Sequence, residues 1–329
     1  MLESPREGFL LCLLTSFACI LFLFICYEIN SVSSHKSQNL YLAFAESNNN
    51  IGFGQTTNIS SSNVTIANLT SMDDVEALYN KGYTVSNLGR YGEAISYYDK
   101  VLTIDPYHID ALYFKGLALS DLGRYEEAIN YYDKVLALKP ESLRALSSKG
   151  NALSKLGLYE DAIAYYDKAL AVDPSAIGVV HNKAFALLNL GRYVEALNNY
   201  DRVLAVEKNN LDAMNDKGNI FLRLQRYQEA LEYFDKILAL KPNNVDIIYN
   251  KGLTLSNLGR YQEALEYYDK ALAIDPNYIK ALNNKGYILF NLGRYQEAIN
   301  FSDKVLAINT HYRPAMDLKK MALGVMDNQ

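Results

Sequence analysis

The residues that most often carry out chemistry are few in this chain and widely separated. Its four histidines have no second histidine or cysteine at the spacing of a metal site: His35, His108, His181 and His311. Glu126 and Glu127 occupy consecutive positions and point to different sides of a helix, which does not suit shared acid–base work. A glycine-rich phosphate loop is also absent. We therefore expect no enzymatic activity, no metal site and no cofactor.

The three cysteines all lie in one apolar stretch near the N-terminus, spaced by seven residues: Cys12, Cys19 and Cys26. Such spacing places them on one helical face, where they form a dimer contact or act simply as small apolar residues. The stretch itself, residues 9–27, contains no charge and follows a short polar segment, residues 1–8. As a helix it nearly spans a hydrocarbon core of roughly 30 Å. This pattern predicts insertion into a membrane.

An uncleaved transmembrane signal anchor is favoured over a cleaved signal peptide. A signal peptide has an apolar region of about 7 to 15 residues and a prompt cleavage site, whereas the nearest small-residue site here is Ala43-Phe44-Ala45. Residues 28–72 are rich in Asn, Ser and Thr and predict a flexible linker. Three glycosylation motifs begin at Asn58, Asn63 and Asn68. They favour an extracytoplasmic location for the rest of the chain, although linkers of this composition also produce such triplets by chance; the alternative is secretion after signal cleavage.

A 34-residue unit then occurs seven times without insertion, over residues 75–108, 109–142, 143–176, 177–210, 211–244, 245–278 and 279–312. Apolar residues follow helical spacing twice in each unit, so each unit is predicted to be a pair of helices. In the sixth unit, Gly259 can end the first helix because glycine adopts a left-handed backbone without a Cβ penalty. Pro276 then ends the second helix. A fixed period of this length indicates a solenoid.

Four positions of the unit recur along the chain. One holds Gly82, Gly116, Gly150, Ala184, Gly218, Gly252 and Gly286, and a second holds Ala94, Ala128, Ala162, Ala196, Ala230, Ala264 and Ala298. A third holds Tyr98, Tyr132, Tyr166, Tyr200, Phe234 and Tyr268, and a fourth holds Pro106, Pro140, Pro174, Pro242 and Pro276. With these residue types at these offsets, residues 75–312 resemble the tetratricopeptide repeat. The chain departs from the pattern at Lys208, Gln225, Ser302 and Thr310.

The resemblance implies an all-α, right-handed superhelix of antiparallel helix pairs that binds peptides or helices along a concave groove formed by the first helices. By the same resemblance the candidate lining residues are Tyr79, Asn80, Tyr83, Tyr113, Leu117, Asn151, His181, Asn182, Phe185, Asn215, Asn219, Tyr249, Asn250, Leu253, Asn283, Asn284 and Tyr287. Aromatic rings among them suit apolar side chains, and amides suit a peptide backbone. The apolar members have an alternative role in packing between adjacent repeats.

One lysine position and one aspartate position also recur, in the first and second helix respectively. They are Lys81, Lys115, Lys149, Lys183, Lys217, Lys251 and Lys285, and Asp99, Asp133, Asp167, Asp201, Asp235, Asp269 and Asp303. We expect a ladder of ion pairs between helices, with lysine stems over apolar surface, or else seven independent solvated pairs. Either arrangement has a structural role.

Charge argues against a nucleic-acid partner, since the chain has a net charge of −5 and no predicted basic face. Most of its 27 tyrosines occupy recurring positions of the repeat and are framework residues. The last segment, residues 313–329, predicts a capping helix over the final repeat. In this helix Lys319 and Lys320 are expected to face water, and the residues expected to face inward are Met316, Leu318, Met321, Ala322 and Val325.

The sequence therefore predicts a membrane-tethered scaffold or assembly factor that binds a protein or peptide. Two other functions remain open at this point. One is a non-catalytic helper subunit of an enzyme complex, for which copurification with an activity would be the evidence. The other is a self-associating structural protein and homo-oligomer, for which the evidence would be a size that depends on concentration.

Overall fold

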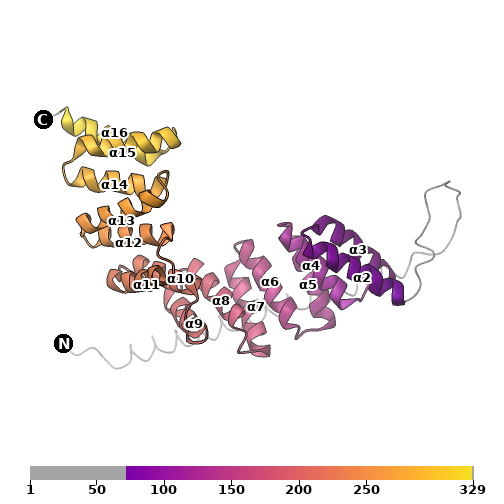
Figure 1. Ribbon diagram of the computed structural model, residues 1–329. Coiled ribbons are helices and arrows are strands. Elements are labelled where there is room, and N and C mark those ends of the chain that lie inside the picture. The colour runs from indigo at the N-terminus through magenta and orange to yellow at the C-terminus, as the bar shows by residue number, and fades with distance from the viewer. Residues whose placement is uncertain (1–71, 328–329) are drawn as a thin grey trace, which may run out of the picture. The chain divides into compact units, whose positions relative to one another are not determined.

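The computed structural model describes residues 72–327, and within them it is entirely helical (Figure 1). Every described helix belongs to one compact unit. The predicted anchor, most of the predicted linker and the three glycosylation motifs lie outside the described residues. None of the helices between Met72 and Met326 combines the length and the apolar character needed to cross a bilayer.

Fifteen helices follow one another within the described part of the chain, and the predicted all-α repeat fold is confirmed. We call the first helix of each repeat helix A and the second helix B. Helices A are α2 (Met72–Asn87), α4 (Ile109–Asp121), α6 (Leu143–Lys155), α8 (Ile177–Asn189), α10 (Leu211–Arg223), α12 (Val245–Asn257) and α14 (Ile279–Asn291). Helices B are α3 (Tyr91–Ile104), α5 (Tyr125–Leu138), α7 (Tyr159–Val172), α9 (Tyr193–Val206), α11 (Tyr227–Leu240), α13 (Tyr261–Ile274) and α15 (Tyr295–Ile308), and α16 (Arg313–Met326) ends the stack.

Each helix A is joined to its helix B by a tight turn with a left-handed residue. Gly259 has φ of +75° there, as its position in the repeat predicted. Gln225 occupies the same position with φ of +59°, so this turn carries the strain expected of a side chain in that conformation. After the turn, Arg260 donates two hydrogen bonds of 2.6 Å to Glu263 in the first turn of α13. The arginine–glutamate pair recurs in other repeats and ties the turn to the start of helix B.

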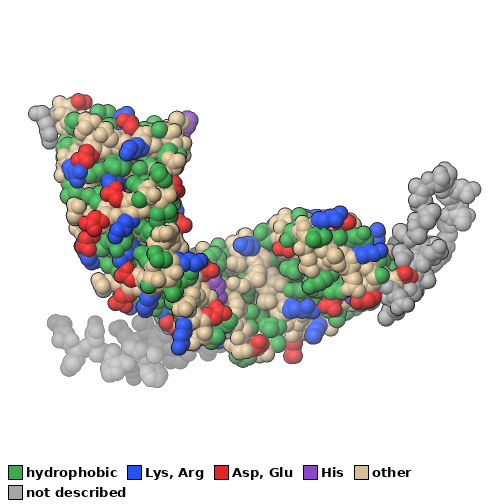
Figure 2. Space-filling view, in the orientation of Figure 1, with side chains coloured by type: hydrophobic (Ala, Val, Ile, Leu, Met, Phe, Trp, Pro, Cys, Tyr) green, Lys and Arg blue, Asp and Glu red, His purple; other side chains and the backbone are tan. Residues whose placement is uncertain are grey.

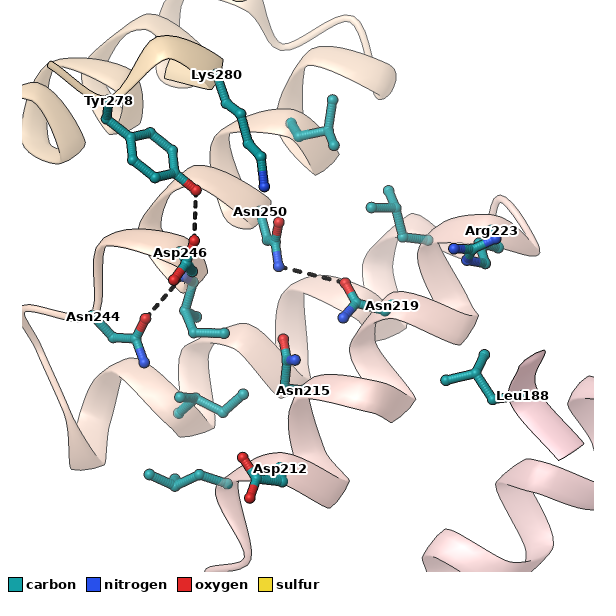
Figure 3. A pocket seen from close by; sticks show the side chains of 15 residues that line it. Leu188, Asp212, Asn215, Asn219, Arg223, Asn244, Asp246, Asn250, Tyr278 and Lys280 are labelled. Atoms are coloured by element: carbon teal, nitrogen blue, oxygen red, sulfur yellow. Dashed lines mark hydrogen bonds between the residues drawn. The ribbon is translucent and has the colours of Figure 1, made fainter. Parts of the chain in front are cut away.

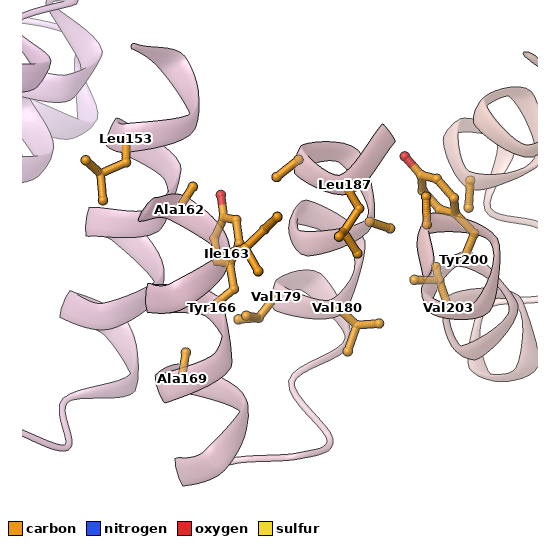
Figure 4. Packing of buried hydrophobic residues seen from close by; sticks show 14 of the residues in the cluster. Leu153, Ala162, Ile163, Tyr166, Ala169, Val179, Val180, Leu187, Tyr200 and Val203 are labelled. Carbon is orange, nitrogen blue, oxygen red and sulfur yellow. The ribbon is translucent and has the colours of Figure 1, made fainter. Parts of the chain in front are cut away.

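The two helices of a repeat cross where a small residue of helix A meets an aromatic ring of helix B. A Cβ atom added at Gly150 would lie 2.6 Å from Cε1 of Tyr166, so the ring occupies the space of the absent side chain. Tyr166 is 1 % exposed and packs in a continuous apolar cluster that extends to Tyr200 and Val203 (Figure 4). Repeat 4 has Ala184 at the glycine position, and both Ala184 and Tyr200 are fully buried. Close crossing thus depends on a small residue facing a ring.

Repeat 7 lacks this ring because Ser302 replaces it, and helix α16 supplies the missing contact. Leu318 approaches to 3.0 Å from where a Cβ of Gly286 would lie, and the Ser302 hydroxyl donates to the Ala298 carbonyl (3.0 Å). Leu318 and Ala322 are buried as predicted, but the prediction for Met316 and Met321 was wrong, since they are 50 % and 49 % exposed. Met316 lies at the position that packs on helix B in other repeats, and α16 has no helix B of its own.

The recurring lysines and aspartates form the predicted ladder, and the pairs join successive repeats. Six of the seven predicted lysines, those of α4 to α14, pair with the aspartate of the preceding helix B: Lys115–Asp99, Lys149–Asp133, Lys183–Asp167, Lys217–Asp201, Lys251–Asp235 and Lys285–Asp269. Lys81 lies in α2, which no helix B precedes among the described residues. Lys319 of α16 forms a further ion pair of this kind with Asp303, at 2.6 Å between Nζ and Oδ1, so this lysine was wrongly predicted to face only water. The lysine ends are less exposed than predicted, because the Lys217 side chain is 5 % exposed and its ammonium lies 4.9 Å from the Tyr233 ring centroid. The lysine ladder therefore ties each repeat to the one before it.

Candidate binding groove

A hollow of about 700 Å³ lies across the helices A of the fifth and sixth repeats (Figure 3). Four predicted lining residues face it: Asn215, Asn219, Asn250 and Leu253. The wall is completed by Leu188, Leu211, Asp212, Leu222, Arg223, Ile237, Asn244, Asp246, Ile247, Tyr278 and Lys280. We call this site the amide hollow. Successive helices A build it because the 34-residue period places the same face of each helix side by side.

The amides of the hollow are linked to each other but are not saturated. The Asn250 side chain donates from Nδ2 to Oδ1 of Asn219 over 3.4 Å. An asparagine amide offers two donor hydrogens and an acceptor oxygen with two lone pairs, so one such bond leaves most of its capacity free. Asn244 has a different task, because its Oδ1 accepts the Ile247 amide (3.2 Å) and caps α12. Asn219 and Asn250 are thus available to a ligand, and Asn244 is part of the fold.

The rim of the amide hollow carries charge. Asp246 accepts a hydrogen bond of 2.6 Å from the Tyr278 hydroxyl, and burial together with this carboxylate raises the pKa of Tyr278 above its usual range. Asp212 lies at the start of α10 and Arg223 at its end. Asp212 and Arg223 belong to no ion pair within residues 72–327. The rim therefore offers free charges of both signs.

A second hollow of about 330 Å³ lies between the second and third repeats. It is lined by the predicted residues Leu117 and Asn151 together with Ser120, Asp121, Tyr125, Tyr132, Ser148, Ala152 and Lys155. Asn151 is already engaged, because its Oδ1 accepts from Tyr166 (2.9 Å) and from Asn182 (2.8 Å). Burial raises the pKa of Tyr132 to about 12, against the opposing effect of its hydrogen bond with Ser120 (3.0 Å). This hollow has less free hydrogen-bonding capacity than the amide hollow.

Aromatic rings dominate the first two repeats, where Tyr83 and Tyr113 each make an edge contact with Phe114 at 5.2 Å between centroids. Tyr83 is 42 % exposed and remains accessible to a partner. Tyr79 instead packs between Tyr98 and His108, and its ring centroid lies 6.3 Å from that of Tyr98 and 5.4 Å from that of His108. This residue thus belongs partly to the framework, which was the alternative left open for the apolar candidates.

The same division holds in the later repeats. His181 and Tyr249 lie at the position of Tyr79 in their repeats. The His181 ring contacts the buried ring of Tyr200, at 5.6 Å between centroids, and the Tyr249 ring contacts that of Tyr268, at 5.9 Å. Asn283, also at this position, is 7 % exposed, whereas Phe185 is 43 % exposed.

Three other candidates are bonded within the fold. Asn80 donates to Glu76 (3.1 Å), Asn284 to the Tyr249 hydroxyl (3.0 Å) and Tyr287 to the Pro314 carbonyl (3.3 Å). None of these contacts tests partner binding, so the lining residues stay predictions.

A half-buried acid beside the amide hollow was not predicted as a functional residue. Asp216 accepts a hydrogen bond of 2.6 Å from the fully buried Tyr200, whose ring also contacts His181. Burial raises the pKa of Asp216, although the Tyr200 hydroxyl and the nearby His181 act in the opposite direction. The available signal was an aspartate in a sequence position that holds asparagine in repeats 1, 4, 6 and 7. No cluster of three or more His, Cys, Asp or Glu suited to a metal ion occurs in the described part of the chain.

Models of the tetratricopeptide repeat match residues 73–141, 113–177, 182–245, 245–278 and 267–300, which together span most of the repeats. A tetratricopeptide repeat protein from Parabacteroides merdae has a similar solved structure, with a TM-score of 0.59, 17 % identity and coverage of 76 % of this chain and 98 % of that one. PilW, a type IV pilus biogenesis factor, aligns with a TM-score of 0.57 and 21 % identity over 64 % and 98 % of the two chains. PilF of Pseudomonas aeruginosa aligns with a TM-score of 0.54 and 20 % identity over 65 % of this chain and 97 % of that one. At these identities the likeness shows the fold alone. No curated protein matches the sequence.

Proposed function

Because the chain belongs to the tetratricopeptide repeat family, we propose that it is a membrane-tethered scaffold that holds a peptide segment of a partner protein in the amide hollow. The observation that carries this proposal is a hollow of about 700 Å³ whose wall includes two asparagines with free hydrogen-bonding capacity. Its volume falls within the roughly 300 to 1,000 Å³ of typical ligand sites. No chemical step is involved, and the groove acts by raising the local concentration of its partner.

A peptide suits this wall better than a small apolar ligand. Asn219 and Asn250 can pair with the N–H and C=O groups of an extended backbone, which otherwise lose their hydrogen bonds to water on binding. Leu222 and Leu253 lie in the same wall and can cover apolar side chains of the segment. The mixture explains how one surface can bind both the backbone and the side chains of a partner.

The membrane tether rests on the apolar stretch at residues 9–27 and on the linker of residues 28–72. A chain of about 45 flexible residues has a mean reach of roughly 35 to 40 Å, so the repeats would stand clear of the bilayer. The glycosylation motifs at Asn58, Asn63 and Asn68 support an extracytoplasmic location for the repeats. Together they favour surface or secreted proteins as the partners of the groove.

Site-specific photo-cross-linking in cells tests the binding proposal. A photoreactive residue at Leu253 inside the amide hollow should capture one partner, and the same residue at the exposed Leu240 of α11 should not. Adding Asn219→Arg should abolish the capture by filling the hollow. Equal capture from both positions, or capture that survives Asn219→Arg, would show that the hollow is not the binding site.

Protease treatment of intact cells or spheroplasts, together with membrane fractionation, tests the tether. If the repeats are membrane-bound and are cleaved from outside, the anchor and the outward topology are correct. Repeats that stay protected until lysis would place the groove on the cytoplasmic side. Repeats recovered in the medium would indicate secretion after signal cleavage.

A further inference from the structure

A single stripe of side chains on α10 runs the length of the amide hollow. Asp212, Asn215, Asn219, Leu222 and Arg223 all line it, and their spacing of three, four, three and one residues keeps them on one side of the helix. Asp212 and Arg223 lie at opposite ends of this stripe, with the asparagines between them (Figure 3). A ligand that follows α10 therefore meets a negative charge, then amides and a leucine, then a positive charge.

This order of charges is confined to the fifth repeat. The positions of Asp212 and Arg223 hold Asp110 and Asp121 in repeat 2 and Arg144 and Lys155 in repeat 3. Repeats 1, 4, 6 and 7 have an uncharged residue at the second position: Asn87, Asn189, Asn257 and Asn291. Both charges also complement the dipole of α10, but the other helices A form without such a pair. Helix stability alone therefore does not explain why α10 has opposite charges at its two ends.

The negative end of the stripe is reinforced by a second helix. Asp246 of α12 lies on the same rim as Asp212 and uses one oxygen for Tyr278 (2.6 Å), which leaves its other oxygen open. Lys280 of α14 is also on this rim, so two carboxylates and one ammonium group leave it with a net negative charge. On the face shown in Figure 2 acidic and basic side chains are otherwise interspersed, without a large field of one sign.

The length of α10 sets the spacing that a ligand needs. Asp212 and Arg223 are eleven residues apart in sequence, which is about 16 Å along a helix that rises about 1.5 Å per residue. An extended peptide rises about 3.3 Å per residue, so about five residues cover the same distance. Successive side chains of an extended segment point to opposite faces, so a cation and an anion that both face the hollow must be an even number of positions apart. A spacing of four positions spans about 13 Å, and the long side chains of the two residues and of Arg223 cover the remaining distance.

We propose that the amide hollow selects an extended segment with a basic side chain between Asp212 and Asp246 and an acidic side chain on Arg223, four residues away on the same face of the segment. This inference rests on the proposed function and adds the chemistry that the partner must carry. Backbone groups of the segment meet Asn215 and Asn219, and an apolar residue covers Leu222. The charges fix the register of the segment, because a shift of two residues removes both ion pairs at once.

Fluorescence anisotropy with capped ten-residue peptides on the full chain in detergent tests the proposal. The four probes carry Lys and Glu, Lys and Lys, Glu and Glu, or Gln and Gln four positions apart in one background of Leu, Asn and Ala. The Lys and Glu peptide should bind about tenfold more tightly than the Gln and Gln peptide, and the advantage should shrink in 0.5 M salt. A Lys and Glu peptide with a spacing of two should lose the advantage.

Matched variants assign the effect to Arg223. In Arg223→Glu the preferred probe should change from the Lys and Glu peptide to the Lys and Lys peptide. The control Lys139→Glu makes the same charge change at the exposed C-cap of α5, outside both hollows, and should leave the preference unchanged. Arg223→Gln provides a second variant if Arg223→Glu lowers the melting temperature, and it should abolish the preference for the Lys and Glu peptide over the Lys and Lys peptide.

Two outcomes overturn the inference. If the four peptides bind alike, or if Arg223→Glu and Lys139→Glu behave alike, the charges do not select the ligand, and cross-linking from Leu253 still decides the proposed function. If no peptide binds while cross-linking captures a partner, the inference about an extended charged segment is wrong and the groove function stands. Failure of both experiments removes the groove function as well.

Discussion

The face of helix A that crosses helix B and the face that lines the groove follow opposite rules. At the crossing the residues hardly change along the chain, and Gly150 against Tyr166 is repeated with small variations from the first repeat to the sixth. In the groove the same helices change character, from Tyr83 and Phe114 near the N-terminal end to Asn219 and Asn250 in the amide hollow. Uniform crossings give the first six repeats the same contact between helix A and helix B.

This difference separates stability from recognition. A crossing residue is closed off by a ring, so a change there alters packing and has no direct contact with a ligand. A groove residue is open to solvent on one side, so a change there alters the surface that a partner meets. Substitutions at the two faces test this separation, and the largest effect is expected at the crossing.

Overpacking the crossing should give the largest loss of stability. Gly150→Val places two methyl groups against the Tyr166 ring, where even a Cβ would lie 2.6 Å away, and should lower the free energy of unfolding by about 3 kcal/mol. The control Gly178→Val adds the same side chain to a helical glycine with no atom within 4 Å of the new Cβ. Urea denaturation of both variants measures the difference. Equal losses would mean that the close approach to Tyr166 does not limit the crossing.

A groove substitution should weaken binding without changing stability. Asn219→Ala removes one amide from the wall of the hollow. The Kd for the segment captured by cross-linking should rise about fivefold to tenfold, which corresponds to a loss of about 1 kcal/mol of binding free energy. The melting temperature should stay the same. Asn257→Ala, an exposed asparagine at the end of α12, is the matched control and should affect neither property. A fall in stability for Asn219→Ala alone would assign the amide to the framework.

The lysine ladder should belong to the framework. In Lys217→Met a nearly buried ammonium is replaced by an apolar side chain, while Asp201 stays hydrated because it is 62 % exposed. Stability should rise by at most about 1 kcal/mol, since a buried ion pair often contributes no more than an apolar contact, and binding should not change. Lys319→Met, whose side chain is 36 % exposed, should show a smaller effect in the same denaturation experiment. Lost binding with intact folding would contradict a structural role.

The smallest effect should depend on pH and involve Asp216. Burial raises its pKa in the folded state, so its protonated form favours folding, and that stability is lost as pH rises through the folded pKa. Asp216→Asn keeps an acceptor for Tyr200 without the buried charge. The variant should therefore melt at a higher temperature than the native chain at pH 7 and at the same temperature near pH 3. A gain that is independent of pH would indicate that the charge is not responsible.

Several features of the fold could be predicted from particular residues. Gly259 and Pro276 marked the ends of two helices, and the left-handed backbone predicted at Gly259 is present. The recurrence of Lys217 and Asp201 predicted the ladder, because identical positions in successive repeats must lie in line. The exposure of Met316 was predicted wrongly because helical spacing does not show which neighbouring helix is missing.

The binding residues were harder to predict than the fold. Tyr79 and Tyr83 are separated by one helical turn, yet Tyr79 packs on Tyr98 and only Tyr83 is largely exposed. Asn151 and Asn219 share a position in the repeat, but Asn151 already accepts two hydrogen bonds and Asn219 only one from Asn250. Such differences depend on neighbours from other helices, which a sequence position alone does not identify.

The sequence by itself determined the helical repeat, its length and its order, because the spacing of small, aromatic and apolar residues allows only one way to bury them along the chain. Tertiary structure alone decided which repeats open into a hollow and which groove side chains are free. Hydrogen bonds and burial are made between residues of different helices, such as Asn250 and Asn219, so they exist only when the repeats are stacked. The position of Asp212 and Arg223 at the two ends of one hollow likewise arises only in that stack.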